Sequence, residues 1–321
     1  MPIRTVLGDI AAGGLGYTHC HEHLFVFKTF EVSLPERMIV DRYEKTKNEV
    51  LKFKNRGGGA IVDAQPFGAG RHPLLLKKLA EDTGIHVISS TGFHKAGFYR
   101  KNFWSFDAPV KDIAELFISE IERGMYEHDY KNPFRKRSNI KAGVIKIATE
   151  SEGLTPYYKK VFDAAVQAHK ITGAPILTHT ELSTCGMEQA DYLIRGGVNP
   201  GAIIISHMDR KIETKKNIDL AGLGVFLEYD TISRFRYHSD EEEVLLIKTM
   251  IEEGFENQIL LGMDSTRDRY PSYGGELGLD HVISTFLPLL KESGVKSGSL
   301  EKIMVQNPMR ALEFKSSKRV S

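Results

Sequence analysis

The feature that most constrains the fold is a regular alternation of two hydrophobic patterns along the chain. Short apolar, β-branched runs bounded by glycine, proline or polar residues are typical of buried strands. With an opening segment at 16–18 there are eight such runs, the others being 60–63, 85–90, 142–147, 175–178, 202–206, 225–227 and 258–261. Longer segments with a helical period lie between them, at 43–53, 74–81, 113–123, 157–169, 187–194, 217–223 and 241–253.

Strands that alternate with helices in this way predict parallel βαβ units, and the number eight favours closure into a (β/α)8 TIM barrel of the α/β class. An open doubly wound sheet is the alternative. No G-x-G-x-x-G follows a strand, however, and the glycines at 57–59 precede one. We therefore expect a single domain over residues 1–321, with the barrel over residues 16–314 and a frayed tail at 315–321.

The charge balance limits the possible partners. The chain has 43 Lys and Arg against 42 Asp and Glu, so it lacks the basic footprint of a nucleic-acid-binding protein. Its apolar runs are shorter than the roughly 18 residues that a membrane helix needs. With Cys20 and Cys185 as the only cysteines and no secretory signal, the sequence predicts a cytoplasmic protein with a small-molecule substrate. We interpret the basic loop 128–139 as a solvated excursion, with a subunit or ligand contact as the alternative.

Polar residues stand at the carboxyl ends of the predicted strands, where a TIM barrel carries its active site. His21 and His23 are two residues apart, so they point to the same side of an extended chain. Lys146 is a charged residue inside an apolar strand, and three later strands are followed by His179, His207 and Asp264. This coincidence predicts a metal site. Four other histidines complete no spacing pattern and are interpreted as structural: His19, His86, His169 and His281.

The number and type of these ligands indicate two metal ions. Imidazoles and carboxylates suit Zn, Mn, Co or Fe, and six protein ligands are too many for one tetrahedral catalytic ion with an open position. We expect zinc. Because an ammonium group cannot bind a cation, Lys146 must be deprotonated or modified. Reaction of its amine with carbon dioxide would give a carbamate that could bridge both ions.

Taken in order, these pieces resemble the phosphotriesterase family of the amidohydrolase superfamily. The matching segments are THCHEHL at 18–24, AGVIK at 142–146, THT at 178–180, SHMDR at 206–210, GMD at 262–264 and QNP at 306–308. The resemblance implies that His21, His23 and Asp264 hold the more buried metal. It likewise implies that His179 and His207 hold the more exposed one, that carboxylated Lys146 bridges the two, and that a homodimer is possible.

Two positions depart from well-known members of that family. His94 stands where several triesterases and lactonases have an aromatic side chain, and Tyr229 stands where they have histidine or arginine. These departures disfavour a paraoxon-type hydrolase and a hydrophobic acyl-homoserine lactonase.

The expected chemistry arises from two ions that share a water. Coordination lowers the pKa of that water and supplies a bridging hydroxide, while the exposed ion polarises the substrate oxygen. We expect Asp264 to act as general base during the attack and to return the proton to the leaving oxygen.

The loops beyond the strands are basic, which favours a substrate with a phosphate group. The predicted substrate contacts are Arg267, Tyr270, Arg234, Lys95, Tyr99 and Tyr229. A branch of the family that is similar in these loops hydrolyses phosphorylated sugar lactones, so we expect a hydrolase that opens a phosphorylated sugar 1,4-lactone. The alternatives are a broad-specificity organophosphate triesterase or unphosphorylated lactone hydrolase, and a barrel that binds metal or ligand without turnover.

Overall fold

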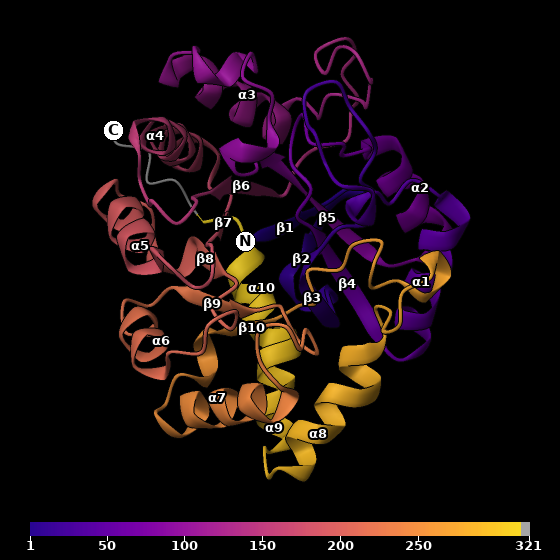
Figure 1. Cartoon of the computed structure of the whole chain (residues 1–321), viewed down its shortest axis with the longest axis vertical. Coiled ribbons are helices and arrows are strands. Elements are labelled where there is room, and N and C mark those ends of the chain that lie inside the picture. The colour runs from indigo at the N-terminus through magenta and orange to yellow at the C-terminus, as the bar shows by residue number, and fades with distance from the viewer. Residues whose placement is uncertain (316–321) are drawn as a thin grey trace.

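The computed structural model describes residues 1–315, and its centre is a sheet of eight parallel strands paired in chain order. These strands are β3 (Tyr17–Glu22), β4 (Gly58–Asp63), β5 (His86–Gly92), β6 (Val144–Ala148), β7 (Ile176–His179), β8 (Ile203–Ser206), β9 (Phe226–Tyr229) and β10 (Ile259–Leu261) (Figure 1). Hydrogen bonds also join the carboxyl end of the first strand to the segment that follows the last one. The Asp264 N–H donates to the His21 carbonyl at 3.0 Å, and the His23 N–H donates to the Ser265 carbonyl at 3.2 Å. The sheet therefore closes, and the predicted barrel is confirmed.

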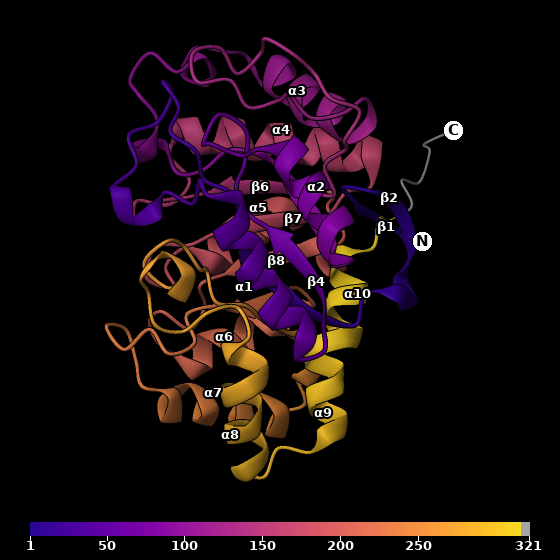
Figure 2. The same ribbon diagram turned by 90° about the vertical axis from the view of Figure 1, so that its right-hand side faces the viewer.

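Helices cover the outside of the barrel (Figures 1 and 2). The seven predicted helices are confirmed with small shifts at their ends: α1 (Tyr43–Asn55), α2 (Pro73–Thr83), α3 (Val110–Glu122), α4 (Pro156–Thr172), α5 (Gly186–Arg195), α6 (Thr214–Ala221) and α7 (Asp240–Glu252). No helix among residues 1–315 is long and apolar enough to cross a membrane. The expected frayed tail concerns residues 316–321, which lie outside the described part of the chain.

Three helices after β10 were not predicted: α8 (Leu287–Glu292), α9 (Ser297–Glu301) and α10 (Asn307–Leu312). Pro288 and Pro308 fall inside these helical stretches, and a proline within an apolar period normally marks a helix end. In the structure, one turn of π-helix leads directly into α8 and another into α10, so each proline follows a π-turn within a continuous helical stretch, where the regular hydrogen-bond pattern is already interrupted.

The amino-terminal end of the barrel is closed by an antiparallel hairpin, β1 (Pro2–Thr5) and β2 (Gly8–Ala11), together with α10 (Figure 2). Ile3 of this hairpin and Leu15 pack under the residues that fill the barrel. The filling residues come from all eight strands and are apolar: Cys20, Ala60, Val62, Ile88, Val144, Leu177, Ile204, Phe226 and Leu260.

The strand period of two places a polar layer above this apolar one. Lys146 lies two residues beyond Val144, and His179 lies two residues beyond Leu177, so each points to the same interior side as its apolar partner. Both polar side chains are buried at the carboxyl end of the barrel. The same alternation that fills the core therefore delivers the residues of the site.

Glu22 fastens the seam between β3 and β10. Its buried side chain accepts hydrogen bonds from the N–H groups of Met263 and Ser265, each at 2.9 Å, and His19 Nδ1 lies 2.8 Å from the same carboxylate. His19 is thus a structural histidine, as its lack of a spacing pattern indicated. One carboxylate links the strand that ends in the histidine pair to the segment that carries Asp264.

Replacing Glu22 by Gln should weaken this closure. The amide would turn an N–H group toward a backbone N–H, and leaving a buried donor unpaired costs about 1–3 kcal/mol. We expect the free energy of unfolding of the metal-free protein in urea to fall by that amount. Glu44→Gln, at an exposed position on α1, is the control and should leave it unchanged. Equal stabilities of the two variants would contradict the role of Glu22.

Candidate metal centre

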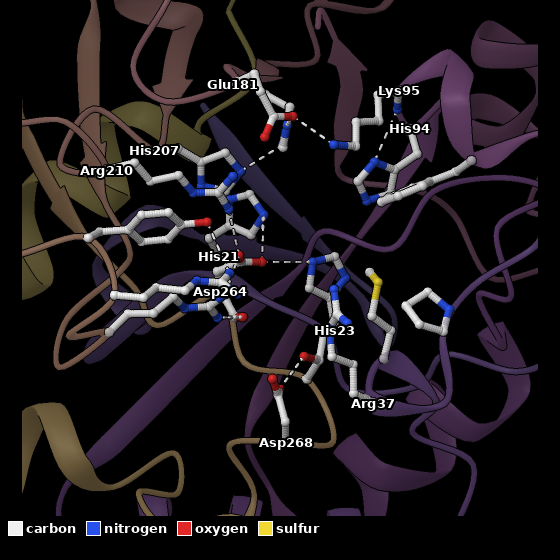
Figure 3. Close-up of a pocket in the computed structure, with 18 residues that line it drawn as sticks. His21, His23, Arg37, His94, Lys95, Glu181, His207, Arg210, Asp264 and Asp268 are labelled. Carbon is white, nitrogen blue, oxygen red and sulfur yellow. Dashed lines mark hydrogen bonds and ion pairs between the residues drawn. The ribbon is translucent and has the colours of Figure 1, made fainter.

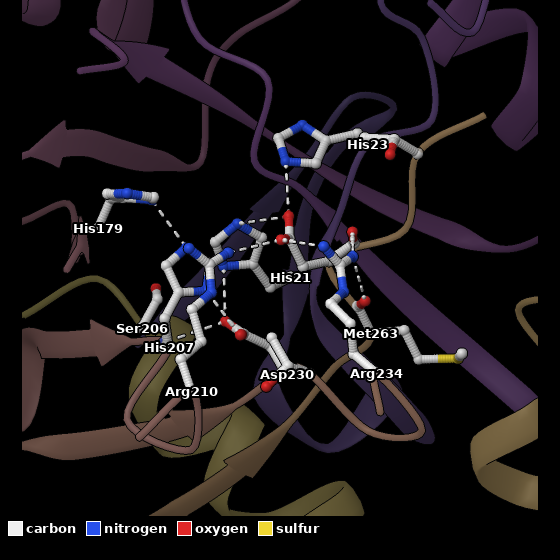
Figure 4. Close-up of polar contacts among 12 residues, drawn as sticks. His21, His23, His179, Ser206, His207, Arg210, Asp230, Arg234 and Met263 are labelled. Carbon is white, nitrogen blue, oxygen red and sulfur yellow. Dashed lines mark hydrogen bonds and ion pairs between the residues drawn. The ribbon is translucent and has the colours of Figure 1, made fainter. Parts of the chain in front are cut away.

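The structure brings the six predicted metal ligands together at the carboxyl end of the barrel, and all six are buried. His21 Nε2 lies 3.3 Å from Lys146 Nζ, and His23 Nε2 lies 3.1 Å from Asp264 Oδ1. On the other side of the cluster, His207 Nε2 and His179 Nδ1 converge to 2.8 Å (Figures 3 and 4). Five different strands or their following loops thus contribute to one site.

Two of these residues sit on a strained backbone. His207 and Asp264 have φ angles of 64° and 46°, in the left-handed region that residues other than glycine rarely adopt. His207 directly follows β8, and Asp264 follows β10. Strain of this kind costs about 1–3 kcal/mol and is characteristic of functional sites. Here it turns both side chains back over the barrel.

Lys146 also depends on a close backbone approach. The Phe93 N–H donates to the Lys146 carbonyl at 2.8 Å, and Gly92 has a φ of 96°. A Cβ atom at Gly92 would lie 1.8 Å from the Lys146 carbonyl oxygen. Only glycine lets β5 run this close to the lysine.

The histidines are oriented through their Nδ1 atoms. Asp230 accepts at both carboxylate oxygens, 2.6 Å from His207 Nδ1 and 3.2 Å from His21 Nδ1. Glu228 Oε2 lies 2.8 Å from His21 Nδ1, and Gln65 Oε1 lies 2.6 Å from His23 Nδ1 (Figure 4). These contacts leave the Nε2 atoms of the three histidines facing the centre, as in protein metal sites generally.

The sequence analysis did not identify these orienting residues, although a signal was present. Glu228 and Asp230 are two and four residues beyond Phe226, which fills the barrel, so the strand period places both on the inside. The prediction of the strand at 225–227 ended before reaching them. Gln65 comes from the loop after β4 and carried no such signal.

Burial opposes the charged forms of these ligands to different degrees. It lowers the pKa of Lys146 to about 8 and that of His179 to about 3. Burial opposes the protonation of His21 as well, but the carboxylates of Glu228 and Asp230 outweigh it and raise the pKa of His21 to about 9. A cation that binds His21 must therefore displace a proton, so metal affinity should rise with pH.

The two oxygens of Asp264 face different groups. Oδ1 faces the histidines, 3.1 Å from His23 and 3.9 Å from His21, whereas Oδ2 accepts from Arg210 at 2.8 Å and lies 3.6 Å from Arg234 Nη1. Burial alone would raise the pKa of Asp264, but Arg234, His23 and Arg210 together hold it well below its usual range. The side chain is a carboxylate whose orientation is fixed from two sides.

A cavity of about 300 Å³ lies over this cluster (Figure 3). Five cationic side chains line it: Arg37, Lys95, Arg210, Arg234 and Arg236. Lys95 pairs with Glu181 at 2.6 Å, while Arg210 and Arg234 face Asp264. Within residues 1–315, no carboxylate lies within 4.0 Å of the guanidinium of Arg37 or Arg236. The mouth of the cavity therefore offers two unneutralised positive charges.

Of the predicted substrate contacts, Lys95 and Arg234 line the cavity, but Arg267 and Tyr270 do not. Arg267 donates to Glu36 at 3.2 Å, and its guanidinium packs on the ring of Tyr273. Tyr270 is fully buried, and its hydroxyl donates to the His23 carbonyl at 3.2 Å. Arg267 and Tyr270 are close to Asp264 in the sequence, but their side chains point away from the cavity because the chain turns within the loop.

Tyr99 and Tyr229 also lie outside the lining of the cavity. The Tyr99 hydroxyl donates to the Phe67 carbonyl at 3.1 Å. Tyr229 is one residue out of phase with the interior positions of β9, so it points outward, where its hydroxyl donates to Asn217 at 3.2 Å. Arg37, Arg210 and Arg236, which are not among the predicted contacts, line the cavity.

The barrel and its cluster of histidines, carboxylates and a lysine define a metal-binding (β/α)8 protein. The model of the phosphotriesterase family matches residues 1–312, and the chain belongs to this family.

Individual relatives share the sequence and the fold over nearly the whole length. The chain is 37% identical, over 97% of its length and 91% of the relative, to a phospho-furanose lactonase of Mycoplasmopsis synoviae. It superimposes with a TM-score of 0.93 on an amidohydrolase from Mycoplasma synoviae, at 34% identity and covering 100% and 94% of the two chains. A phosphotriesterase homology protein from Escherichia coli, whose crystal structure has phosphate in the active site, gives a TM-score of 0.84 at 29% identity, with 94% and 99% covered.

Replacing Asp230 by Asn should weaken metal binding about 10- to 100-fold, the usual cost of losing such a partner of a ligating histidine. An amide offers only one acceptor oxygen, so either His207 loses its orienting contact or His21 keeps only the contact to Glu228. Competition with a chelator measures the apparent Kd for zinc. Asp219→Asn, an exposed position on α6, should leave it unchanged. Identical affinities in the two variants would show that Asp230 does not orient the ligands.

Proposed function

We propose that this protein is a metal-dependent hydrolase that opens a sugar lactone carrying a phosphate group. The observation that carries the proposal is the position of Arg37 and Arg236 at the mouth of the cavity over the metal cluster, where no described carboxylate neutralises them. The name of the Mycoplasmopsis synoviae relative and the phosphate in the Escherichia coli structure support the same substrate class.

The donor set fits two divalent ions, with zinc preferred because four imidazoles dominate it. His21, His23 and Asp264 would hold one ion, and His179 and His207 the other. When bound, two such ions lower the pKa of a water molecule and polarise the carbonyl of the substrate.

Lys146 would join the two halves of the centre as a carbamate. The neutral amine attacks the carbon of carbon dioxide, an N–C bond forms, and the nitrogen loses a proton to solvent. The product is a carboxylate-like group that would be available to both ions. Burial lowers the pKa of the amine to about 8 and so favours the neutral form that reacts.

Asp264 moves the proton in this scheme. It accepts a proton from the attacking water and returns it to the ring oxygen as the carbonyl C–O bond breaks, so the lactone opens to a hydroxy acid. Arg210 and Arg234 keep the carboxylate ionised and oriented toward the histidines.

The phosphate of the substrate would lie at the mouth of the cavity. Arg236 comes from the loop after β9 and Arg37 from the long connection between β3 and α1, so the two face the cavity from different elements. Charge-assisted hydrogen bonds to a phosphate are worth about 1.5–3 kcal/mol each. Because both guanidiniums are exposed, the lower part of this range applies to each of them.

The test is a comparison of matched substrates with the metal-loaded protein. We expect a five-membered sugar lactone with a terminal phosphate to be hydrolysed with a kcat/KM at least about tenfold above that of the same lactone without phosphate. Acid release at constant pH measures both rates. A preference for the unphosphorylated lactone or for an organophosphate triester would overturn the assignment of the phosphate. An absence of turnover on all three would leave a binding barrel.

Single substitutions of Arg236 and Arg37 test whether each of them binds the phosphate. Arg236→Ala and Arg37→Ala should each lower kcat/KM for the phosphorylated lactone roughly tenfold while sparing the unphosphorylated one, since only the former makes the ionic contacts. Arg267→Ala is the matched control, because it removes the same charge from a neighbouring loop but faces Glu36. If only the Arg267 variant lost activity on the phosphorylated lactone, the phosphate contact would belong to Arg267, as the sequence predicts.

Substitutions of Lys146 test the bridge. Lys146→Glu places a carboxylate near the same position and should retain more zinc than Lys146→Ala after loading, as metal analysis of the two variants measures. In the wild type, labelled bicarbonate should give a carbamate signal by NMR that both variants lack. Zinc content equal in the wild type and the alanine variant, with no such signal, would show that Lys146 is not a bridging ligand.

A further inference from the structure

A second group of metal-ligating side chains lies apart from the centre described above. Asp209 belongs to the loop after β8, His238 precedes α7, and Glu243 lies in the first turn of α7. Each offers one ligand atom within 4.8 Å of the others, and all three side chains are buried. None of them lines the cavity over the first centre.

Among the described residues, three of the four carboxylate oxygens in this group lack a hydrogen-bond donor. Within the described residues, Asp209 Oδ1 and both oxygens of Glu243 are buried without a hydrogen bond. His238 does not satisfy them, because its ring nitrogens lie 3.9 Å from Asp209 Oδ2 and 3.7 Å from Glu243 Oε2, beyond hydrogen-bond distance. Buried carboxylates need a proton or a cation to offset the loss of hydration.

We propose that Asp209, His238 and Glu243 bind a divalent transition-metal ion, with zinc preferred, at a structural site distinct from the catalytic centre. One imidazole and two carboxylates are ligands that zinc accepts. Ligand atoms in a tetrahedral zinc site are about 3.3–3.6 Å apart. Small side-chain rotations would bring the present separations, which are within 4.8 Å, to that range. Thr231 Oγ1 lies 3.1 Å from His238 Nε2 and would be the fourth ligand of the ion.

The ion would tie α7 to the loops that carry the first centre. Asp209 follows His207 by two residues, and its Oδ2 accepts from the Thr231 N–H at 2.6 Å. Thr231 in turn directly follows Asp230, the partner of His21 and His207. A cation held here therefore stabilises the segments that position the catalytic ligands without touching the substrate.

The competing arrangement is a proton shared between the two carboxylates. Burial, followed by the charge of Asp209, raises the pKa of Glu243 well above its usual value, so a proton could serve if no metal binds. The two arrangements differ in whether Glu243 affects the metal content of the protein.

Metal analysis of the wild type, Glu243→Gln and Glu241→Gln distinguishes them. Each protein is produced with zinc present during folding and freed of loosely bound zinc. We expect the Glu243 variant to hold one zinc ion fewer per chain than the other two. Glu241 is exposed in the same turn of α7, so its variant controls for the loss of one negative charge. Because the readout is a difference, it does not depend on how many ions the catalytic centre holds.

A second measurement on the wild type covers the case in which Glu243→Gln does not fold. Diffraction data from zinc-loaded crystals, collected at the zinc absorption edge, should show an anomalous peak bonded to Asp209, His238 and Glu243. Equal zinc content in the three proteins, or an absence of this peak while the catalytic centre shows its own, would overturn the proposal in favour of the shared proton.

Discussion

The hydrogen-bonded seam between β3 and β10 is the contact on which the site depends. His21 belongs to the first strand of the barrel and His23 directly follows it, whereas Asp264 follows the last strand, 241 residues after His23. They meet because the Asp264 N–H bonds to the His21 carbonyl, and because Glu22 accepts from the backbone on both sides of Asp264. Closing the barrel and assembling three ligands are thus the same event.

The centre also concentrates buried charge. Glu228, Asp230 and Asp264 are carboxylates, while Arg210 and Lys146 contribute positive charge, and nearly all of this lies out of water. Such networks are favourable only when each member has its partners. Asp230 illustrates how partners are shared, since its two oxygens serve histidines of two different strands. Bound cations would complete the balance, so stability should depend on metal as well as on packing.

Periodic parts of the molecule could be predicted from the sequence, whereas parts without a period were missed. In the strands, the seven helices and the ligands at strand ends, side chains face the same side every two residues (strands) or every 3.6 residues (helices). The spacing of apolar residues in the sequence shows these periods directly. The helices after β10 were missed because Pro288 and Pro308 obscure the period. Tyr229 was placed on the wrong side of its strand. A shift of one residue along a strand turns a side chain from the inside of the barrel to the outside. Arg267 lies in a loop, where the side chains of residues close in the sequence need not point the same way.

The loop after β9 shows how selectivity can be built on this scaffold. Thr231 and His238 lie near its two ends, and these residues meet, with Thr231 Oγ1 3.1 Å from His238 Nε2. The Thr231 N–H is also held by Asp209, so both ends of the loop are fastened at one buried point. Arg234 and Arg236 project from the span between them into the cavity. A loop closed on itself in this way can change its exposed side chains without moving His207 or Asp230, which lie below it. Arg236 contacts none of the metal ligands, so a change at this position would leave the centre in place, whereas Arg234 also holds Asp264.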